Sequence, residues 1–323
     1  MIVRISLLST LFVLICACGT SQGPKYQEGL NTPSFTYNKL SDTERDRLNT
    51  EVKAKYEKLL GNRGFSGQIL VAKNGEIVFE DYKGYANISL KTPVVPETPI
   101  HLASVSKTFT GMVALKLWEQ EKLDLKAPVT KYLPNFPYTE VTIEQLLSHR
   151  SGLPDYTYFM ESRKYASVKV KNKRGRWVKK LKLIQNDRPF KDGTYTNQDV
   201  LDYMVQKRPA PAANPDRVFR YCNTNYVMLA LLVEKITGQP FPKYMKDSVF
   251  TPLGMKNSFV FSKSDTGRYI PSYMYNNRVY GLERLDCTYG DKNIYSTVRD
   301  LLKFDRARNK PGFLEPSLLK QVY

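Results

Sequence analysis

Histidine, cysteine and cofactor-binding motifs are scarce in this sequence of 323 residues. It contains two histidines and four cysteines, and His101 and His149 are far apart along the chain. There is no cluster with metal-ligand spacing, no GxGxxG motif and no phosphate-binding loop. We therefore expect neither a metal nor a cofactor, and any nucleophilic catalysis must work without a neighbouring histidine in the sequence.

The apolar run at the N-terminus is too short to cross a bilayer as a helix. It extends from Ile5 to Ile15, follows Arg4 and precedes Cys16-Ala17-Cys18, an order typical of a secretory signal. The tetrapeptide that ends at Cys18 is also similar to a bacterial lipobox, in which that cysteine becomes the lipidated N-terminus. A plain secreted precursor, cut nearby, is the alternative.

This interpretation divides the chain into three parts. We expect a lipoprotein signal peptide at 1–17, a Gly-, Ser- and Pro-containing tether at 18–39 and a folded domain at 40–323. The mature protein would be anchored by lipid to a membrane of the cell envelope and face the periplasm or the exterior. Which membrane carries the anchor is not indicated by the sequence.

Acidic residues are outnumbered, with 31 Asp and Glu against 49 Lys and Arg, which gives a formal net charge of +18. Ten of the basic residues, and no acid, lie between Arg163 and Lys182. Valines alternate with lysines there before a turn-like Asn172–Gly175, which predicts a basic β-ribbon at about 163–185. A solvated surface hairpin is the simplest interpretation, and contact with anionic lipid or polymer is the alternative. Nucleic-acid binding is not expected for an exported chain.

With 41% hydrophobic residues the chain can bury a large core. Local patterns predict several of its elements. A capping box at Ser41 precedes a helix with an apolar face that includes Tyr56, Leu59 and Leu60. A hairpin follows at 68–82, and a later helix is expected to be capped by Asn197. Only Cys222 and Cys287 remain in the predicted domain, and two free thiols are favoured over a pair.

The segment Ala103–Phe109, ASVSKTF, places Ser104 and Lys107 three residues apart at the predicted buried start of a helix. Residues at this spacing share a helix face, so the amine can lie against the serine oxygen. This pairing is one way to make serine a nucleophile without histidine. The tetrad is weak evidence alone, because 317–320 repeats it and because a core helix N-capped by Ser104 explains it equally well.

A second segment, Phe219–Tyr226 or FRYCNTNY, precedes an apolar helical run. In order and flanks, the two segments resemble the serine β-lactamase and penicillin-binding family, in particular its β-lactamase-related, class C-like serine hydrolases. The resemblance extends from about Phe65 to Phe304. It is carried, in order, by residues 65–67, 104–109, 132–134, 146–154, 221–226, 252–255 and 295–297.

The resemblance implies an α+β, β-lactamase/transpeptidase-like fold: an antiparallel sheet flanked by helices, with a helical subdomain and the active site between them. It implies that Ser104 is the acylated nucleophile, that Lys107 and Tyr221 handle protons, and that Asn223 binds the substrate amide. A lysine or tyrosine has an ordinary pKa of about 10, which must fall towards 7 for general-base catalysis. Which of the two is the base stays open.

The expected activity is that of a monomeric serine hydrolase acting through an acyl-enzyme on a small-molecule or peptide substrate. A β-lactam, a peptide ending in D-Ala and an ester are all compatible with the sequence. His149 stands in a segment that the resemblance makes structural, so we do not expect it to be catalytic.

One element of the family pattern is not found. The family carries a Lys or His, then Thr or Ser, then Gly on a late strand whose backbone N–H completes the oxyanion hole. Asp265-Thr266-Gly267 has an acid in place of the cation and precedes Tyr295–Thr297 instead of following it. About 50 residues, with three strands and a helix, are therefore expected to be missing after Tyr323.

The missing element leaves the activity of this chain open, since an oxyanion donor contributes about 3 kcal/mol. The main alternative is a catalytically inactive envelope lipoprotein that binds peptide or glycan in the same cleft. A scaffold protein whose working part is the basic ribbon is a further alternative.

Overall fold

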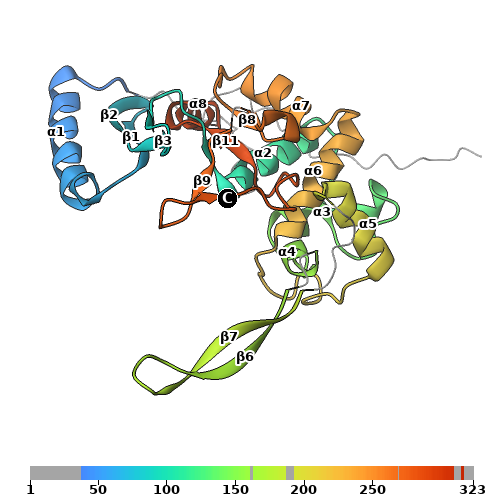
Figure 1. Ribbon diagram of the computed structural model, residues 1–323. Helices are drawn as coiled ribbons and strands as arrows, with labels where there is room; N and C mark the ends of the chain where they lie inside the picture. Colours follow the sequence, from blue (N-terminus) through green and yellow to red (C-terminus); the bar gives the residue numbers. More distant parts are fainter. Residues whose placement is uncertain (1–37, 161–162, 187–192, 268, 309–313, 316–323) are drawn as a thin grey trace, which may run out of the picture. The chain divides into compact units, whose positions relative to one another are not determined.

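The computed structural model describes residues 38–160, 163–186, 193–267, 269–308 and 314–315 (Figure 1). Its α-helices are α1 (Asp42–Leu59), α2 (Ser106–Glu119), α3 (Ile143–Leu147), α4 (Tyr156–Phe159), α5 (Asn197–Lys207), α6 (Asn223–Thr237), α7 (Phe241–Met245) and α8 (Val298–Arg308). Its strands are β1 (Gly67–Lys73), β2 (Glu76–Lys83), β3 (Tyr85–Asn87), β4 (Thr92–Pro93), β5 (Ile100–His101), β6 (Arg163–Lys171), β7 (Trp177–Asn186), β8 (Phe259–Val260), β9 (Ser272–Tyr273), β10 (Val279–Tyr280) and β11 (Ile294–Ser296). None of the helices in the described ranges has the length and hydropathy that crossing a bilayer requires.

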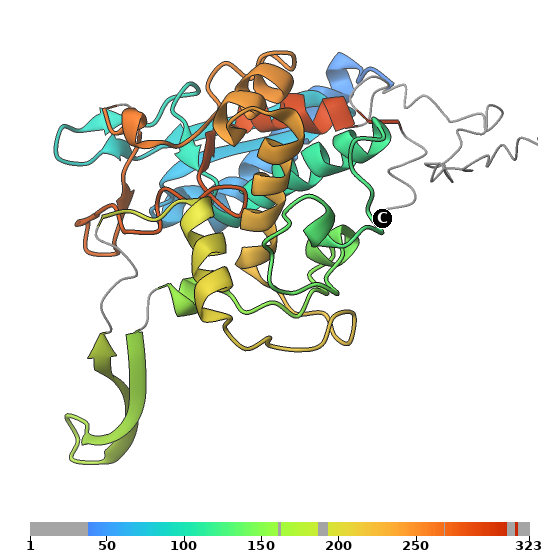
Figure 2. The ribbon, with the colours of Figure 1, turned by 90° about the vertical axis from the view of Figure 1, so that its right-hand side faces the viewer.

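The first two strands form the predicted antiparallel hairpin. Asn74 and Gly75 make its two-residue turn with φ values of 52° and 74°, the left-handed region that such turns require. Within the described residues, β1 and β2 pair only with each other, although the family resemblance implies further strands beside them. The C-terminal helix α8 contacts β1 (Figure 2), and the Val298 N–H donates to Gln68 Oε1 at 3.1 Å.

Helix α1 packs on this hairpin through Tyr56, whose ring lies 5.2 Å from that of Phe79. The predicted apolar face is wrong at its end, because Leu59 and Leu60 are 59% and 42% exposed. The helix stops at Leu59, and only Tyr56 in it is fully buried. The capping box is also half formed: Ser41 accepts the Glu44 N–H, but the Glu44 carboxylate pairs with Lys73 instead.

A three-stranded antiparallel sheet, in the order β5-β11-β8, leads into the candidate site. Strand β5 ends at His101, and a 3-10 turn at Ala103–Val105 connects it to α2. The Leu102 N–H donates to Ile294 O at 2.9 Å, which fixes the start of this turn against β11. The sheet therefore determines where the turn, and with it Ser104, is placed.

Helices α2 and α6 pack together, and both contribute many of the buried apolar side chains. Most residues of both helices are buried, as their apolar sequences predict. Gly238 ends α6 with φ 68°, the left-handed ending that glycine favours. Together these helices form the core on which the site is built.

The structure corrects one predicted helix cap. The N-cap of α5 is Thr196, and Asn197 is the first helical residue. Thr196 forms a capping box with Asp199, whereas the buried Asn197 side chain donates to Val227 O and Tyr289 O. Sequence alone cannot distinguish the two adjacent polar residues, because both types are good caps.

Two further expectations concern single segments. Cys222 and Cys287 are both free thiols, as favoured from the sequence. The segment Asp265-Thr266-Gly267 lies in and after a 3-10 turn at Lys263–Asp265, not in a strand. It therefore lacks the extended backbone of the family's third element.

Candidate active site

Ser104 lies in the 3-10 turn just before α2 and is exposed, whereas Lys107 is 6% exposed. The predicted burial of the helix start does not extend to Ser104, and the alternative interpretation of Ser104 as the N-cap is wrong, because the N-cap is Val105. Helix α2 starts at Ser106, whose Oγ accepts the Ile294 N–H at 3.0 Å and so holds the helix start against β11. The serine hydroxyl is consequently accessible, and the lysine that follows it points into the protein.

The backbone immediately before the serine is strained. Ala103 has φ 46°, the left-handed region that non-glycine residues adopt at a cost of about 1 kcal/mol or more. Such a conformation persists only where the surrounding structure fixes it, and it is concentrated at functional sites. The strained turn presents Ser104 away from the helix axis.

The Lys107 amine is surrounded by three acceptors. Its Nζ lies 3.2 Å from Ser104 Oγ, 2.9 Å from Asn223 Oδ1 and 2.8 Å from Asp291 O. An ammonium can donate to all three. A neutral amine can donate to Asn223 and Asp291 and accept the Ser104 hydroxyl proton, so the geometry satisfies both protonation states.

Tyr221 approaches the same serine oxygen from a loop 117 positions away, with its hydroxyl 2.8 Å from Ser104 Oγ. Its ring centre is 5.0 Å from Lys107 Nζ, within the range of a cation–π contact. Ser104 Oγ therefore has two polar neighbours, an amine and a phenol, each able to accept or donate a proton.

His149 packs against Tyr221, and its contacts with the described residues do not include Ser104. Its ring lies 4.5 Å from the Tyr221 ring, and its Nδ1 accepts the Cys222 N–H at 3.1 Å. Burial, and then the positive charge of Lys107, lower the pKa of His149 to about 4. The neutral ring is thus an acceptor that positions the Tyr221 segment, in agreement with the structural interpretation of this histidine.

This histidine makes stability depend on pH. The unfolded chain binds a proton at a pKa of 6.5, whereas folded His149 does so only at about 4. Stability from this residue is therefore complete above pH 6.5 and is lost as the pH falls towards 4. At pH 4.5 the loss is about 2 to 3 kcal/mol.

We expect the stability gap between the wild type and His149→Asn, measured by urea unfolding, to shrink by about 2 to 3 kcal/mol from pH 7.5 to 4.5. Asparagine tolerates the φ of 55° at this position and does not titrate. The comparison is made in a His101→Asn background, because burial also lowers the pKa of His101 and would add a second pH-dependent contribution. A gap that stays constant over this range would contradict the assignment.

Asp155 holds the Asn223 side chain in one orientation. Asp155 Oδ2 accepts both the Asn223 backbone N–H, at 2.7 Å, and the Nδ2 group, at 3.0 Å. A carboxylate at the first turn of α6 is also favoured by the helix dipole. Asn223 therefore directs Oδ1 towards Lys107, and its Nδ2 group donates to Asp155. Asp155 was not predicted from the sequence, although it directly follows residues 146–154, which carry part of the family resemblance.

The loop before β11 supplies the third acceptor for Lys107. Gly290 has φ 95°, and a Cβ there would lie 2.3 Å from Tyr226 O, so only glycine fits against α6. The next residue, Asp291, offers its carbonyl to Lys107, and its buried carboxyl accepts the Tyr156 hydroxyl at 2.8 Å. Burial raises the pKa of this carboxyl. No sequence motif signalled this backbone contact.

Some predicted features lie elsewhere. Cys18 and the second Ser-x-x-Lys tetrad at 317–320 fall outside the described residues. In the part of the chain that is described, no group of three or more His, Cys, Asp or Glu side chains is placed to hold a metal ion.

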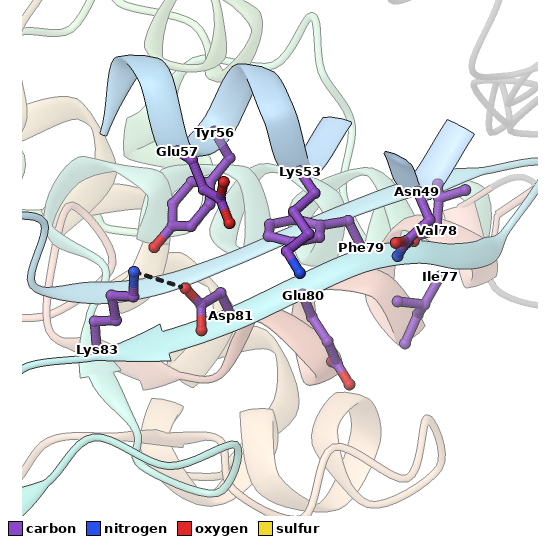
Figure 3. Close-up of a pocket in the computed structure, with 10 residues that line it drawn as sticks. All are labelled: Asn49, Lys53, Tyr56, Glu57, Ile77, Val78, Phe79, Glu80, Asp81 and Lys83. Carbon is purple, nitrogen blue, oxygen red and sulfur yellow. Dashed lines mark hydrogen bonds and ion pairs between the residues drawn. The ribbon is translucent and has the colours of Figure 1, made fainter. Parts of the chain in front are cut away.

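A separate polar groove of about 500 Å³ lies between α1 and β2 (Figure 3). Charged side chains line much of it, including Lys53, Glu57 and the Asp81–Lys83 pair, whose atoms are 3.5 Å apart. None of Ser104, Lys107, Tyr221 or Asn223 contributes to it. The candidate active site is therefore identified by the convergence of reactive groups on one oxygen, not by this groove.

The geometry agrees with the comparisons with known proteins. The family model described as Beta-lactamase matches residues 52–323, so the chain belongs to the Beta-lactamase family of serine hydrolases. Its α+β, β-lactamase/transpeptidase-like fold, predicted from the sequence, is confirmed.

Penicillin-binding protein 4* of Bacillus subtilis is 29% identical over 285 residues, which cover 83% of this chain and 57% of that protein. The D-amino acid amidase of Ochrobactrum anthropi has a similar structure, with a TM-score of 0.62, 23% identity and coverage of 84% and 73% of the two chains. A β-lactamase/D-alanine carboxypeptidase from Pseudomonas syringae gives a TM-score of 0.61, 20% identity and coverage of 85% and 69%. The chain thus spans 57% of the length of the first of these relatives.

Proposed function

We propose that this protein is an exported serine hydrolase that forms an acyl-enzyme on Ser104. The observation that carries the proposal is the convergence of Lys107 Nζ, at 3.2 Å, and the Tyr221 hydroxyl, at 2.8 Å, on Ser104 Oγ. A positioned amine or phenol that removes the serine proton is the general way to activate such a nucleophile.

The reaction has two equivalent proton routes in this geometry. The Ser104 proton passes to a neutral Lys107 amine or to a Tyr221 phenolate while Oγ bonds to the substrate carbonyl carbon. The resulting tetrahedral oxyanion collapses, the carbonyl–leaving group bond breaks, and the acid–base pair returns the proton to the leaving nitrogen or oxygen. Water then attacks the carbonyl carbon of the serine ester and loses its proton by the same route. The bond to Ser104 Oγ breaks, Oγ regains the proton, and the carboxylic acid is released.

The substrate proposed here is a β-lactam, a peptide ending in D-Ala or an ester. Two proteins of similar structure are a D-amino acid amidase and a β-lactamase/D-alanine carboxypeptidase, which supports a carbonyl substrate of that class. The Asn223 amide, held by Asp155, is suited to a substrate carbonyl. Exposed Val105 and Phe219, which neighbour Ser104 and Tyr221 in sequence, suit an apolar substituent.

The proposal is tested by incubating the protein with a fluorescent penicillin and, separately, with a fluorophosphonate. Intact-mass and peptide analysis should place one adduct on Ser104. If the folded protein forms no adduct with either reagent yet binds cell-wall peptide, the inactive peptide-binding alternative is favoured instead.

Export and lipid anchoring are also proposed, on the basis of residues 1–18. Mass spectrometry of the mature N-terminus should find a diacylglyceryl group on Cys18, and Cys18→Ala should abolish it. A mature chain that starts elsewhere, without lipid, would favour the plain secreted alternative.

A further inference from the structure

Strands β6 and β7 form a basic hairpin that is a sheet of its own. Its tip is well defined: Asn172 Oδ1 accepts the Arg174 and Arg176 N–H groups at 2.9 and 3.0 Å, and Gly175 has φ 71°. A two-stranded hairpin is marginally stable in water by itself. A partner that covers it would therefore stabilise it.

Between Ser167 and Lys180 the hairpin exposes seven cations. They are Lys169, Lys171, Lys173, Arg174, Arg176, Lys179 and Lys180. Within the described residues none of the seven is in an ion pair. Lys169 stands directly opposite Lys179 in the ladder, and like charges at such positions destabilise a strand pair. The described part of the chain therefore leaves these seven cations without an acidic partner, and an anionic surface would relieve their repulsion.

Apolar groups accompany this charge near the tip. Trp177 is 66% exposed and Val178 is 40% exposed. Lys171 stands opposite Trp177 in the ladder, with its Nζ 5.4 Å from the ring centre. Trp177 shares one face of the hairpin with Lys169, Lys171 and Lys179, whereas Val178 lies on the opposite face. The combination suits the boundary between lipid headgroups and acyl chains, where tryptophan and basic residues are favoured together.

We propose that the β6–β7 hairpin binds the surface of an anionic phospholipid bilayer, with Trp177 in the headgroup interface and the surrounding cations on lipid phosphates. The bilayer is preferred to a soluble polyanion because burying the exposed Trp177 ring is favourable only against a partner with an apolar layer. This proposal does not depend on the reaction proposed for Ser104.

The test uses the full chain and two kinds of vesicle, phosphatidylcholine alone and phosphatidylcholine with 30% phosphatidylglycerol. Because an N-terminal lipid or apolar segment would bind both kinds, the quantity compared is the added affinity for the anionic vesicles. The hairpin variant carries Lys169→Glu, Lys179→Glu and Lys180→Glu. The matched control reverses three exposed lysines of α1, Lys53→Glu, Lys55→Glu and Lys58→Glu, with the same change in net charge.

We expect the hairpin variant to lose at least about tenfold in affinity for anionic vesicles, and the α1 variant less than about threefold. Binding by the wild type should weaken as salt is raised. The Trp177 emission, obtained as the difference between the wild type and Trp177→Phe, should shift to shorter wavelength on anionic vesicles. Circular dichroism of each variant should match the wild type.

Three outcomes would overturn the proposal. The first is equal loss in both triple variants, which would reduce the effect to net charge. The second is equal affinity for the two kinds of vesicle. The third is an unchanged Trp177 spectrum together with equally tight binding to soluble polyphosphate, which would indicate a polyanion as the partner.

Discussion

Replacing Ser104 by alanine is expected to abolish adduct formation and to lower the rate of substrate acylation by about 10⁴-fold or more. The reason is that, among the described residues, Ser104 carries the hydroxyl that contacts both Lys107 Nζ and the Tyr221 hydroxyl. Removing a covalent nucleophile leaves only the contribution of substrate binding and polar stabilisation. Adduct formation is followed by intact mass, and acylation by stopped-flow or discontinuous assay.

The matched control for this prediction is Ser148→Ala. Ser148 is also exposed, and its hydroxyl donates to Glu144 O at 2.8 Å without contacting the site. Both variants should unfold within about 1 kcal/mol of the wild type. If Ser104→Ala still forms the adduct at the wild-type rate, Ser104 is not the nucleophile.

Lys107→Met and Tyr221→Phe are each expected to lower acylation by about 10²- to 10³-fold, and the double variant by little more than the worse single one. Both side chains act on one oxygen, and residues that act as a unit are strongly non-additive. Tyr221→Phe keeps the ring beside His149 and removes only the hydroxyl. Rates of the four proteins form a double-mutant cycle.

The two single variants should differ in stability. Lys107→Met leaves Asn223 Oδ1 and Asp291 O without the donor they now have, which costs about 1 to 3 kcal/mol for each group that stays unpaired. Tyr221→Phe removes a hydroxyl from a residue that is 48% exposed, so its cost is expected to be small. Urea unfolding separates this structural loss from the loss of rate.

The dependence of kcat/KM on pH identifies the base. The variant that loses the rise in rate with pH has lost the group that must be deprotonated. The idea of one acid–base unit would be contradicted by two results together. The rate losses of the single variants would multiply in the double variant, and both single variants would keep the wild-type dependence of kcat/KM on pH.

The local elements of the fold could be predicted where a short pattern fixes the backbone. The Asn74-Gly75 turn defines the β1–β2 hairpin, and the spacing of Thr142 and Gln145 is typical of the capping box that they form at the start of α3. The end of α1 could not be predicted, because the exposure of Leu59 depends on what packs against the helix. Periodicity gives the face of a helix but not the partner that covers it.

The reactive pair Ser104 and Lys107 follows from sequence spacing alone, since three residues along a helix or its first turn bring side chains together. The other members of the site come from distant segments, and only the family resemblance pointed to Tyr221 and Asn223. The supporting roles of Asp155, Asp291 and His149 could be recognised only in the fold. Asp155 acts through its carboxylate and His149 through its ring, and either group can occur in any loop. Asp291 acts through its backbone carbonyl, which every residue has.

The sequence by itself determined which reactive and charged groups are present. They are a serine with a lysine three residues later, two histidines, and a predicted ribbon that contains ten cations and no acid. Tertiary structure decided how those groups are used. It made Ser104 exposed and Lys107 buried, supplied three acceptors around one amine and brought the Tyr221 hydroxyl to the serine oxygen. The physical reason is that spacing controls contacts only within a turn of helix or a hairpin, whereas burial and long-range hydrogen bonds depend on how the segments pack.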